Sequence, residues 1–442
     1  MSCKTFLILS VTVGTFLLSA IACTDTGKNG ADRPRLVKIE KIDSRYTLTV
    51  DGNPFYVKGA GCEFGNIEAL AAHGANSFRA WRTDNGKHSG QEVLDKGLEN
   101  GLMVCMGLEI ARERHGFDYN DAEAVKSQFE YVKGEVLKYK DHPALLAWGI
   151  GNELNLRTTN PAVWDVVNDI AGMIHEVDPN HPATTMLAGF SKGLWDEMKI
   201  RCPNLDFLSF QSYADIINLP AYIKEAGYDG PYLVTEWGAT GHWESPLTEW
   251  GRPIEQNSKN KAESYLYRYK NVIEADRNNC LGSYVFLWGQ KQERTPTWYG
   301  MFLENGDETA SIDVMHFIWN GEWPANQTPR LDSLVMNGRT AYSSISTDPG
   351  EACTASVFVE DPDGDELSTI WEIIPEVPQN KQSDGGDFEK RPASISTGFK
   401  IVSDGSVEFN CPDSHGEYRL FVYVSDGNGH SATANIPFLV KN

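Results

Sequence analysis

The stretches GIGNE at residues 149–153 and LVTEWG at residues 233–238 each place a glutamate directly after a run of strand-forming residues. The two glutamates, Glu153 and Glu236, are separated by roughly three strand–helix units. A parallel barrel brings the carboxyl ends of all its strands to one mouth, so it would bring both carboxyl groups together. The pattern therefore predicts a parallel barrel with a pair of carboxyl groups at its mouth.

The sequence around these stretches alternates between strand and helix patterns. Eight predicted strands lie within roughly 290 residues, as expected for a (β/α)8 TIM barrel. The predicted strands cover residues 54–58, 75–81, 102–107, 144–150, 182–187, 207–210, 232–235 and 282–287. The predicted helices cover residues 67–73, 90–100, 121–139, 162–178, 219–225, 259–276 and 310–319.

The composition changes after Trp323, and the segment 324–330 has the proline and asparagine content of a linker. Residues 331–442 contain short alternating strands separated by turn clusters, which predicts a small all-β immunoglobulin-like sandwich. The aspartate-rich turn 361–365 could bind calcium. A plain type I turn fits it better, because no complete EF-type series of ligands follows.

The N-terminus has the pattern of an export signal. Residues 1–22 read as a lipoprotein signal peptide, Cys23 as the lipid-attachment site, and residues 23–34 as a polar tether before a barrel over 35–323. An ordinary signal peptide with a chance cysteine is the alternative. We expect a lipid-anchored protein of a bacterial cell envelope, on the outer-membrane surface or the periplasmic face.

Charge and composition narrow the possible partners. The net charge of −22 argues against binding to nucleic acid, whereas a neutral substrate would be unaffected by it. The charge is equally well explained by solubility alone. The ten histidines are dispersed and no CxxC or HExxH motif is present, so no metal or other cofactor is expected. We expect a monomer.

The six cysteines that follow Cys23 divide into two groups. Cys353 and Cys411 both lie in the predicted sandwich and could form a bridge in an oxidising compartment. Sequence alone gives no distance between their Cα atoms, so the bridge stays open. Four others are expected to be buried free thiols: Cys62, Cys105, Cys202 and Cys280.

The two glutamate motifs also resemble a known superfamily. Asn152-Glu153 after the fourth strand and the Thr-Glu-Trp-Gly of 235–238 on the seventh are similar to the motifs of clan A glycoside hydrolases. The segments PFYVKG at 54–59 and GANSFR at 74–79 resemble the same clan. The resemblance covers most of the barrel and implies a retaining glycosidase, which needs two carboxyl groups close together.

The resemblance implies a role for each matching residue. Glu153 would be the general acid/base and Glu236 the nucleophile. Asn152 would hydrogen-bond the 2-hydroxyl of the sugar, and Arg79 would hold the nucleophile ionised, although a buried ion pair that only braces the barrel would look the same in sequence. Two aromatic residues would complete the cleavage subsite, Tyr213 near the nucleophile and Trp288 as its floor.

Several tryptophans fall in loop-like positions after strands, where an indole could stack on a sugar ring. They are Trp81, Trp237, Trp243, Trp250 and Trp298. Any single one of them is more often a packing residue than a platform. Among the twelve tryptophans only Trp371 lies in the predicted sandwich, so the barrel is expected to bind the sugar and the sandwich to act as a spacer or brace.

Within the clan, a two-domain lipoprotein of this size most resembles the family 158 endo-β-1,3-glucanases, with family 2 and family 5 barrels next. We therefore expect a retaining endo-β-glycanase that acts on a neutral polysaccharide, with β-1,3-glucan of the laminarin type favoured. The alternatives are a β-mannanase or β-1,4-glucanase of the same clan, a transglycosylase, and a surface glycan-binding lipoprotein with an inactive barrel.

Overall fold

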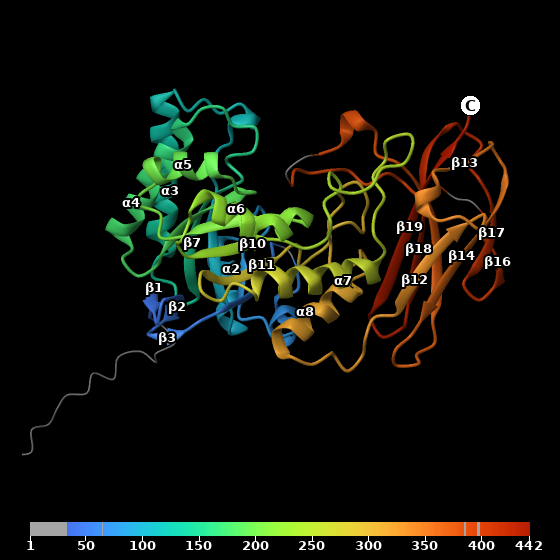
Figure 1. Cartoon of the computed structure of the whole chain (residues 1–442), viewed down its shortest axis with the longest axis horizontal. Helices are drawn as coiled ribbons and strands as arrows, with labels where there is room; N and C mark the ends of the chain where they lie inside the picture. The colour runs from blue at the N-terminus through green and yellow to red at the C-terminus, as the bar shows by residue number, and fades with distance from the viewer. Residues whose placement is uncertain (1–32, 64, 384–385, 396–397) are drawn as a thin grey trace, which may run out of the picture.

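The computed structural model describes residues 33–63, 65–383, 386–395 and 398–442. The predicted signal peptide, Cys23 and nearly all of the predicted tether lie outside these residues. None of the helices in the described part of the chain has the length and apolar character needed to cross a bilayer. Figure 1 shows a barrel surrounded by helices, with a two-layered β-structure packed beside it.

Eight parallel strands close into a barrel, which confirms the predicted fold class. Around the barrel they follow the order β10-β11-β4-β5-β6-β7-β8-β9, so each strand from β4 to β11 lies next to its neighbours in the chain. Their bounds are β4 Val57–Gly61, β5 Ser77–Arg79, β6 Met103–Leu108, β7 Leu145–Asn152, β8 Ala183–Ala188, β9 Leu208–Gln211, β10 Tyr232–Glu236 and β11 Cys280–Val285.

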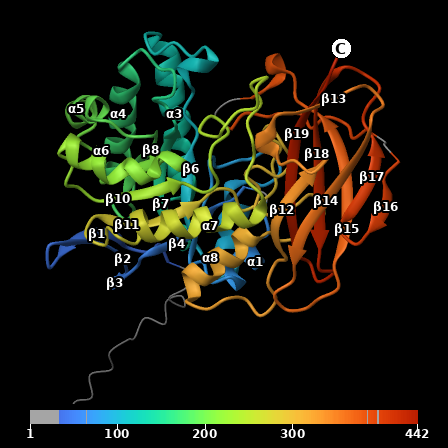
Figure 2. The same ribbon diagram turned by 45° about the vertical axis from the view of Figure 1, so that its right-hand side comes forward.

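Helices cover the outside of the barrel (Figures 1 and 2). They are α1 Ile67–Ala72, α2 Gly90–Glu99, α3 Ala122–Tyr139, α4 Ala162–Val177, α5 Lys192–Arg201, α6 Leu219–Ala226, α7 Ser258–Arg268 and α8 Ala310–Asn320. Short helical turns are η1 Glu113–His115, η2 Ala214–Asn218, η3 Tyr269–Ile273, η4 Ala341–Ser343 and η5 Gln379–Lys381.

Two helices differ from the prediction. The helix α5 was not predicted, because Met198 is its only buried residue and the sequence therefore shows little apolar periodicity there. The helix predicted over 259–276 is α7, which ends at Arg268 and continues as the π-helical turn η3 to Ile273.

The amino-terminal end of the barrel is closed by a three-stranded sheet. This sheet consists of β1 Val37–Ile42, β2 Arg45–Val50 and β3 Asn53–Pro54. The backbone nitrogen of Val37 donates to the carbonyl of Asn180, and that of Tyr46 to Asn278, both in loops that precede barrel strands. The opposite end, where the strands terminate, is the end at which barrels of this kind carry their functional sites.

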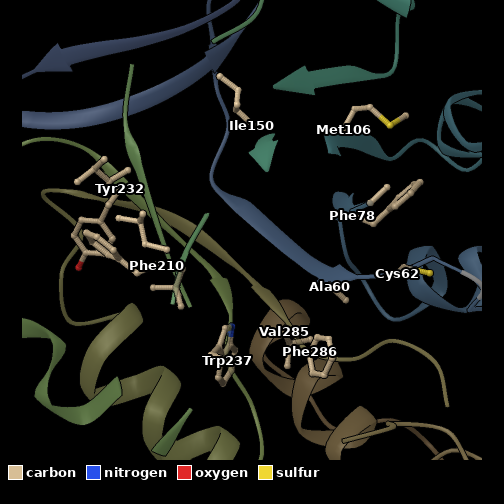
Figure 3. Close-up of a cluster of buried hydrophobic side chains, with 14 of the residues drawn as sticks. Ala60, Cys62, Phe78, Met106, Ile150, Phe210, Tyr232, Trp237, Val285 and Phe286 are labelled. Carbon is tan, nitrogen blue, oxygen red and sulfur yellow. The ribbon is translucent and has the colours of Figure 1, made fainter. Parts of the chain in front are cut away.

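Apolar packing between the strands and the helices holds the barrel together. Strand β7 is buried along its whole length, as expected for a parallel strand with a filled interior on one side and helices on the other. Figure 3 shows part of the main buried cluster, in which Phe78, Phe210 and Trp237 take part. The helix α2 begins at a capping box of Ser89 and Glu92, which satisfies backbone donors of its first turn.

The C-terminal strands form two four-stranded sheets with their own apolar core, as predicted for a sandwich. One sheet contains β12 Arg330–Met336, β14 Ala352–Glu360, β17 Ser406–Asn410 and β16 Lys400–Ser403. The other contains β13 Ile345–Thr347, β19 Ser431–Val440, β18 Gly416–Ser425 and β15 Ser368–Pro375. The thiols of Cys353 and Cys411 are free and buried in this domain, with their Sγ atoms 3.1 Å apart.

The loop that follows β10 fastens the barrel to the sandwich. Its Ile254 belongs to the apolar core of the sandwich. The buried carboxylate of Glu255 accepts a hydrogen bond from Asn435 of β19 at 2.7 Å and pairs with the buried Lys261 of α7. These contacts join the two domains through buried apolar and ionic groups.

Candidate active site

The Glu236 carboxylate lies at the end of β10, where four side chains donate hydrogen bonds to it. Arg79 Nη1 and Trp81 Nε1 each donate to Oε1 at 2.9 Å, and Gln211 Nε2 donates to the same oxygen at 3.0 Å. Tyr213 Oη donates to Oε2 at 3.1 Å. These hydrogen bonds fix the orientation of the carboxylate. The side chain of Glu236 is only 7% exposed.

The donors reach this carboxylate because their strands end at one mouth. Arg79 is the last residue of β5 and Gln211 the last residue of β9, and Tyr213 follows two positions later. Strand β9 pairs with β10, and in that register Gln211 lies directly opposite Glu236. The geometry of the barrel thus brings together residues that are far apart in the sequence.

Arg79 connects the two glutamate motifs. Its guanidinium is 1% exposed, pairs with Glu236 at 2.9 Å, and donates through Nη2 to Oδ1 of Asn152. Nη1 also donates to the carbonyl of Thr235 at 3.1 Å. A cation this deeply buried requires a partner charge, so Arg79 and the carboxylate depend on each other.

Asn152, the last residue of β7, has a saturated amide oxygen. Oδ1 accepts hydrogen bonds from Arg79 and, at 2.8 Å, from Nε2 of Gln211. The amide nitrogen is thereby directed as a donor, which suits the recognition of a hydroxyl group beside Glu236.

Glu153 follows Asn152, and its carboxyl group keeps its proton to a higher pH than an ordinary glutamate. Burial and the nearby charge of Glu236 raise its pKa from 4.5 to about 7, although Arg114 acts in the opposite direction. Its φ of 51° is unusual for a residue other than glycine, and such backbone conformations cluster at functional sites. A protonated carboxyl group beside an ionised one can act as a proton donor near neutral pH.

Two arginines missed by the sequence analysis hold this segment in place. Arg112 Nε donates to the carbonyl of Asn152 at 3.1 Å, and Arg114 Nη1 donates to the carbonyl of Glu153 at 3.2 Å. Both residues lie after β6, in or next to η1. They position the backbone that carries Glu153.

The structure corrects the roles expected for Trp288 and Trp237. Both side chains are fully buried. Trp288 donates through Nε1 to the carbonyl of Asn66 at 2.8 Å and contacts the ring of Trp319 on α8. Trp237 packs against the rings of Tyr265 and Tyr269. Neither tryptophan contacts a carboxylate of the site.

The physical reason differs for the two tryptophans. Successive strand residues point to opposite faces, so Trp237 points outward because Glu236 points into the mouth. At the end of β11 it is Phe286 that lies beside the site, with its ring centroid 5.9 Å from that of Trp81 and 6.0 Å from that of Tyr213. Phe286 therefore occupies the position that was expected for Trp288.

The remaining loop tryptophans also separate into two groups. Trp243 is 59% exposed and its ring lies 5.4 Å from that of Tyr213, so an exposed indole stands beside the Tyr213 side of the site. Trp298 is buried and donates to the carbonyl of Thr240 at 2.8 Å, which makes it a packing residue. The buried Nε1 of Trp250 has no hydrogen-bond partner.

Sequence reasoning missed Gln211 and Phe286 as well. Gln211 is a polar residue at the end of the apolar strand LSFQ. Its position at the end of a barrel strand could have indicated a residue of the site. Phe286 stands directly after β11, but nothing in the sequence distinguishes it from the aromatic residue two positions later.

One group of acidic residues in the described part of the chain could hold a metal ion. Oxygen atoms of Asp361, Asp365 and Asp426 lie within 4.8 Å of one another. All three belong to the sandwich and not to the barrel mouth. Asp361 Oδ1 accepts from the backbone nitrogens of Asp363 and Asp365, as in the turn that the sequence predicted.

Comparison with known proteins gives partial matches. No family model matches the sequence. The chain is 27% identical over 160 residues to a probable mannan endo-1,4-beta-mannosidase C of Aspergillus terreus, a match that covers 29% of this chain and 39% of the relative. It is 34% identical over 152 residues to mannan endo-1,4-beta-mannosidase F of Aspergillus clavatus, covering 28% of this chain and 34% of that protein. The chain thus matches little more than a third of the length of these curated relatives.

Solved structures share the fold. The beta-D-glucuronidase of Dictyoglomus thermophilum aligns with a TM-score of 0.51 at 17% identity, over 66% of this chain and 54% of that one. The beta-glucuronidase of Bifidobacterium dentium aligns with a TM-score of 0.50 at 16% identity, over 65% of this chain and 49% of the other. At this level of identity the likeness concerns the fold alone.

Proposed function

We propose that this protein is a retaining glycoside hydrolase that cleaves internal linkages of a neutral β-linked polysaccharide. The observation that carries the proposal is the carboxylate of Glu236, held by four donors next to a Glu153 whose pKa is raised to about 7. One carboxyl group is fixed and ionised for attack, and the other retains a proton for the leaving group.

In the proposed reaction, Glu236 attacks the anomeric carbon while Glu153 gives its proton to the glycosidic oxygen. A covalent glycosyl-enzyme forms and the aglycone leaves as an alcohol. The ionised Glu153 then takes a proton from water, and the resulting hydroxide releases the sugar from Glu236. The charge of Glu236 contributes to the raised pKa of Glu153, so the two carboxyl groups act on each other electrostatically. Retention is the part of the proposal that the anomer of the first product decides.

The substrate proposed first is β-1,4-mannan. The two curated relatives carry the name mannan endo-1,4-beta-mannosidase, and this supports mannan over the β-1,3-glucan that the sequence analysis favoured. Nothing in the comparisons favours β-1,3-glucan or membership of family 158, so laminarin remains the alternative to be tested. An exposed Trp243 beside Tyr213 suits the stacking of either neutral sugar.

The test is the release of reducing ends from β-mannan, laminarin and a β-1,4-glucan, followed by NMR of the first product. We expect cleavage of β-mannan with the β-anomer formed first. An α-anomer at early times would refute retention, and the absence of cleavage with all three polysaccharides would refute the function proposed here.

We also propose that the protein is exported and lipid-anchored through Cys23 in a bacterial envelope, on the strength of the sequence pattern at residues 1–34 alone. Incorporation of labelled palmitate by the full-length chain, and its loss in Cys23→Ala, tests this proposal. Equal labelling of both proteins would refute it.

A further inference from the structure

Phe388 is a phenylalanine that is 89% exposed, in a segment of the sandwich that contacts the barrel. The segment 386–391 lies between β15 and β16. An isolated exposed apolar side chain needs no explanation by itself. The residues on each side of Phe388, however, are tied to loops at the barrel mouth, and this gives the exposed ring a defined position.

Glu389 fastens the segment to the loop that follows β11. Its side chain is 0% exposed. Oε2 accepts from Arg294 Nη1 at 2.9 Å, and Oε1 accepts from the backbone nitrogen of Arg294 at 2.6 Å and from Gln292 Nε2 at 3.1 Å. A buried carboxylate with this many partners forms a rigid anchor.

Asp387 fastens the other side of Phe388 to the loop after β6. Its Oδ2 lies 3.2 Å from Nε2 of His115. The adjacent Arg114 is close to both Asp387 and Glu153: burial lowers the pKa of its guanidinium, and both carboxylates oppose that shift. The segment therefore approaches the loop that supports Glu153.

The order of the barrel strands shows what lies between these two anchors. Going around the barrel from β11 to β6, the chain passes β4 and β5. Strand β5 ends at Arg79, and Trp81 follows it, and both residues hydrogen-bond Glu236. The segment thus contacts the loops after β11 and β6, and the ends of β4 and β5 lie between these loops in the barrel order. Figures 1 and 2 show the orange loop of the sandwich approaching the barrel.

The chemistry of the segment indicates the ligand. Glu389 is buried in its anchor, whereas Asp387 is 46% exposed beside His115. The ring of Phe388 is the exposed apolar group of the segment. Such a ring offers a flat apolar face to the C–H face of a pyranose. A polysaccharide longer than the units held at the carboxyl pair would extend to the rim.

We propose that Phe388 is a sugar-stacking platform, through which the sandwich forms a distal subsite for the neutral polysaccharide cleaved in the barrel. The proposal rests on the function proposed above and extends it. It makes the sandwich a part of the substrate-binding cleft, which the spacer role expected from the sequence does not include.

The test compares Phe388→Ala with Phe358→Ala in the full-length chain. Phe358 is a matched control, because it is 55% exposed on β14 of the same sandwich. With the polysaccharide that the wild type cleaves, we expect KM to rise about 2- to 10-fold in Phe388→Ala, as for the loss of one aromatic contact. The KM for a short aryl glycoside should be the same in Phe388→Ala as in the wild type. The KM of Phe358→Ala for the polysaccharide should also equal that of the wild type.

A binding measurement separates this proposal from the proposed function. Retardation in gels that contain β-mannan or laminarin needs no turnover, so it applies even if the protein cleaves neither. We expect Phe388→Ala to be retarded less than the wild type and Phe388→Trp to be retarded at least as much. Equal retardation of Phe388→Ala, Phe358→Ala and the wild type, or equal KM values, would overturn the platform while leaving cleavage by the barrel unaffected.

Discussion

The substitution Glu153→Gln tests the acid of the proposed reaction. A glutamate with the ordinary pKa of 4.5 would be about 0.3% protonated at pH 7, and a pKa of about 7 raises that fraction to about one half. The shift corresponds to about 3 kcal/mol of preference for the neutral form, with burial as its main cause and the charge of Glu236 as the next. Glutamine keeps the size of the side chain and removes the proton.

Three effects should follow in kinetics. For a substrate with a poor leaving group, kcat/KM should fall by about 10²- to 10⁴-fold, which is the usual contribution of general acid catalysis. The wild type should lose activity above about pH 7, tenfold per pH unit, and this alkaline limb should be absent in Glu153→Gln. With an activated aryl glycoside the first step should be nearly spared, and azide should restore turnover and give a β-glycosyl azide.

Stability provides a second readout of the same carboxyl group. Because the pKa of Glu153 is raised in the folded state, its contribution to stability is fully present below pH ~4.5 and is lost as the pH rises through about 7. Thermal unfolding of the wild type and Glu153→Gln between pH 4.5 and 8 should show this difference. An alkaline limb that persists unchanged in Glu153→Gln, or an α-configured azide product, would refute the assignment of Glu153 as the acid.

Three further outcomes are expected. Glu236→Gln should lose turnover by ~10⁴-fold or more while its circular dichroism is unchanged, and a 2-fluoro glycoside should label Glu236 in the wild type; appreciable turnover would exclude it as the nucleophile. Arg79→Lys should lower kcat and the melting temperature, since one ammonium cannot replace the fork that joins Glu236 to Asn152; wild-type kcat would show that the fork is dispensable. Oxidised glutathione should link Cys353 to Cys411 by exchange, giving a cross-linked peptide in mass spectrometry and ~2–4 kcal/mol of added stability; thiols that stay free would contradict this.

The regular parts of the fold were predictable because their physical signals are local. Buried strands such as β7 read as continuous apolar runs, and a carboxylate at the end of such a run stands out. The same reasoning failed for α5, where a mostly exposed helix leaves almost no apolar period in the sequence. The positions of Glu153 and Glu236 were therefore predictable, and part of their surroundings was not.

The surroundings depend on the face that a side chain takes beyond the strand end. Trp237 and Trp288 were expected in the sugar site because they adjoin the strand ends, but both are buried and pack against other aromatic or backbone groups. Gln211 reaches Glu236 only through the pairing of β9 with β10, which no single segment of sequence specifies. Contacts across the barrel are properties of the closed sheet.

Both strands that carry a glutamate motif shift register just before it. In β7 the pairing with β8 shifts between Gly149 and Asn152, and in β10 the pairing with β9 shifts between Val234 and Glu236. Gly151 makes the first shift possible: its φ is +71°, and an added Cβ would lie 2.6 Å from Leu154. Irregularities of this kind change the direction of the side chains that follow them. They weaken the regular alternation that sequence reasoning depends on. They also help to direct the two glutamate motifs toward each other.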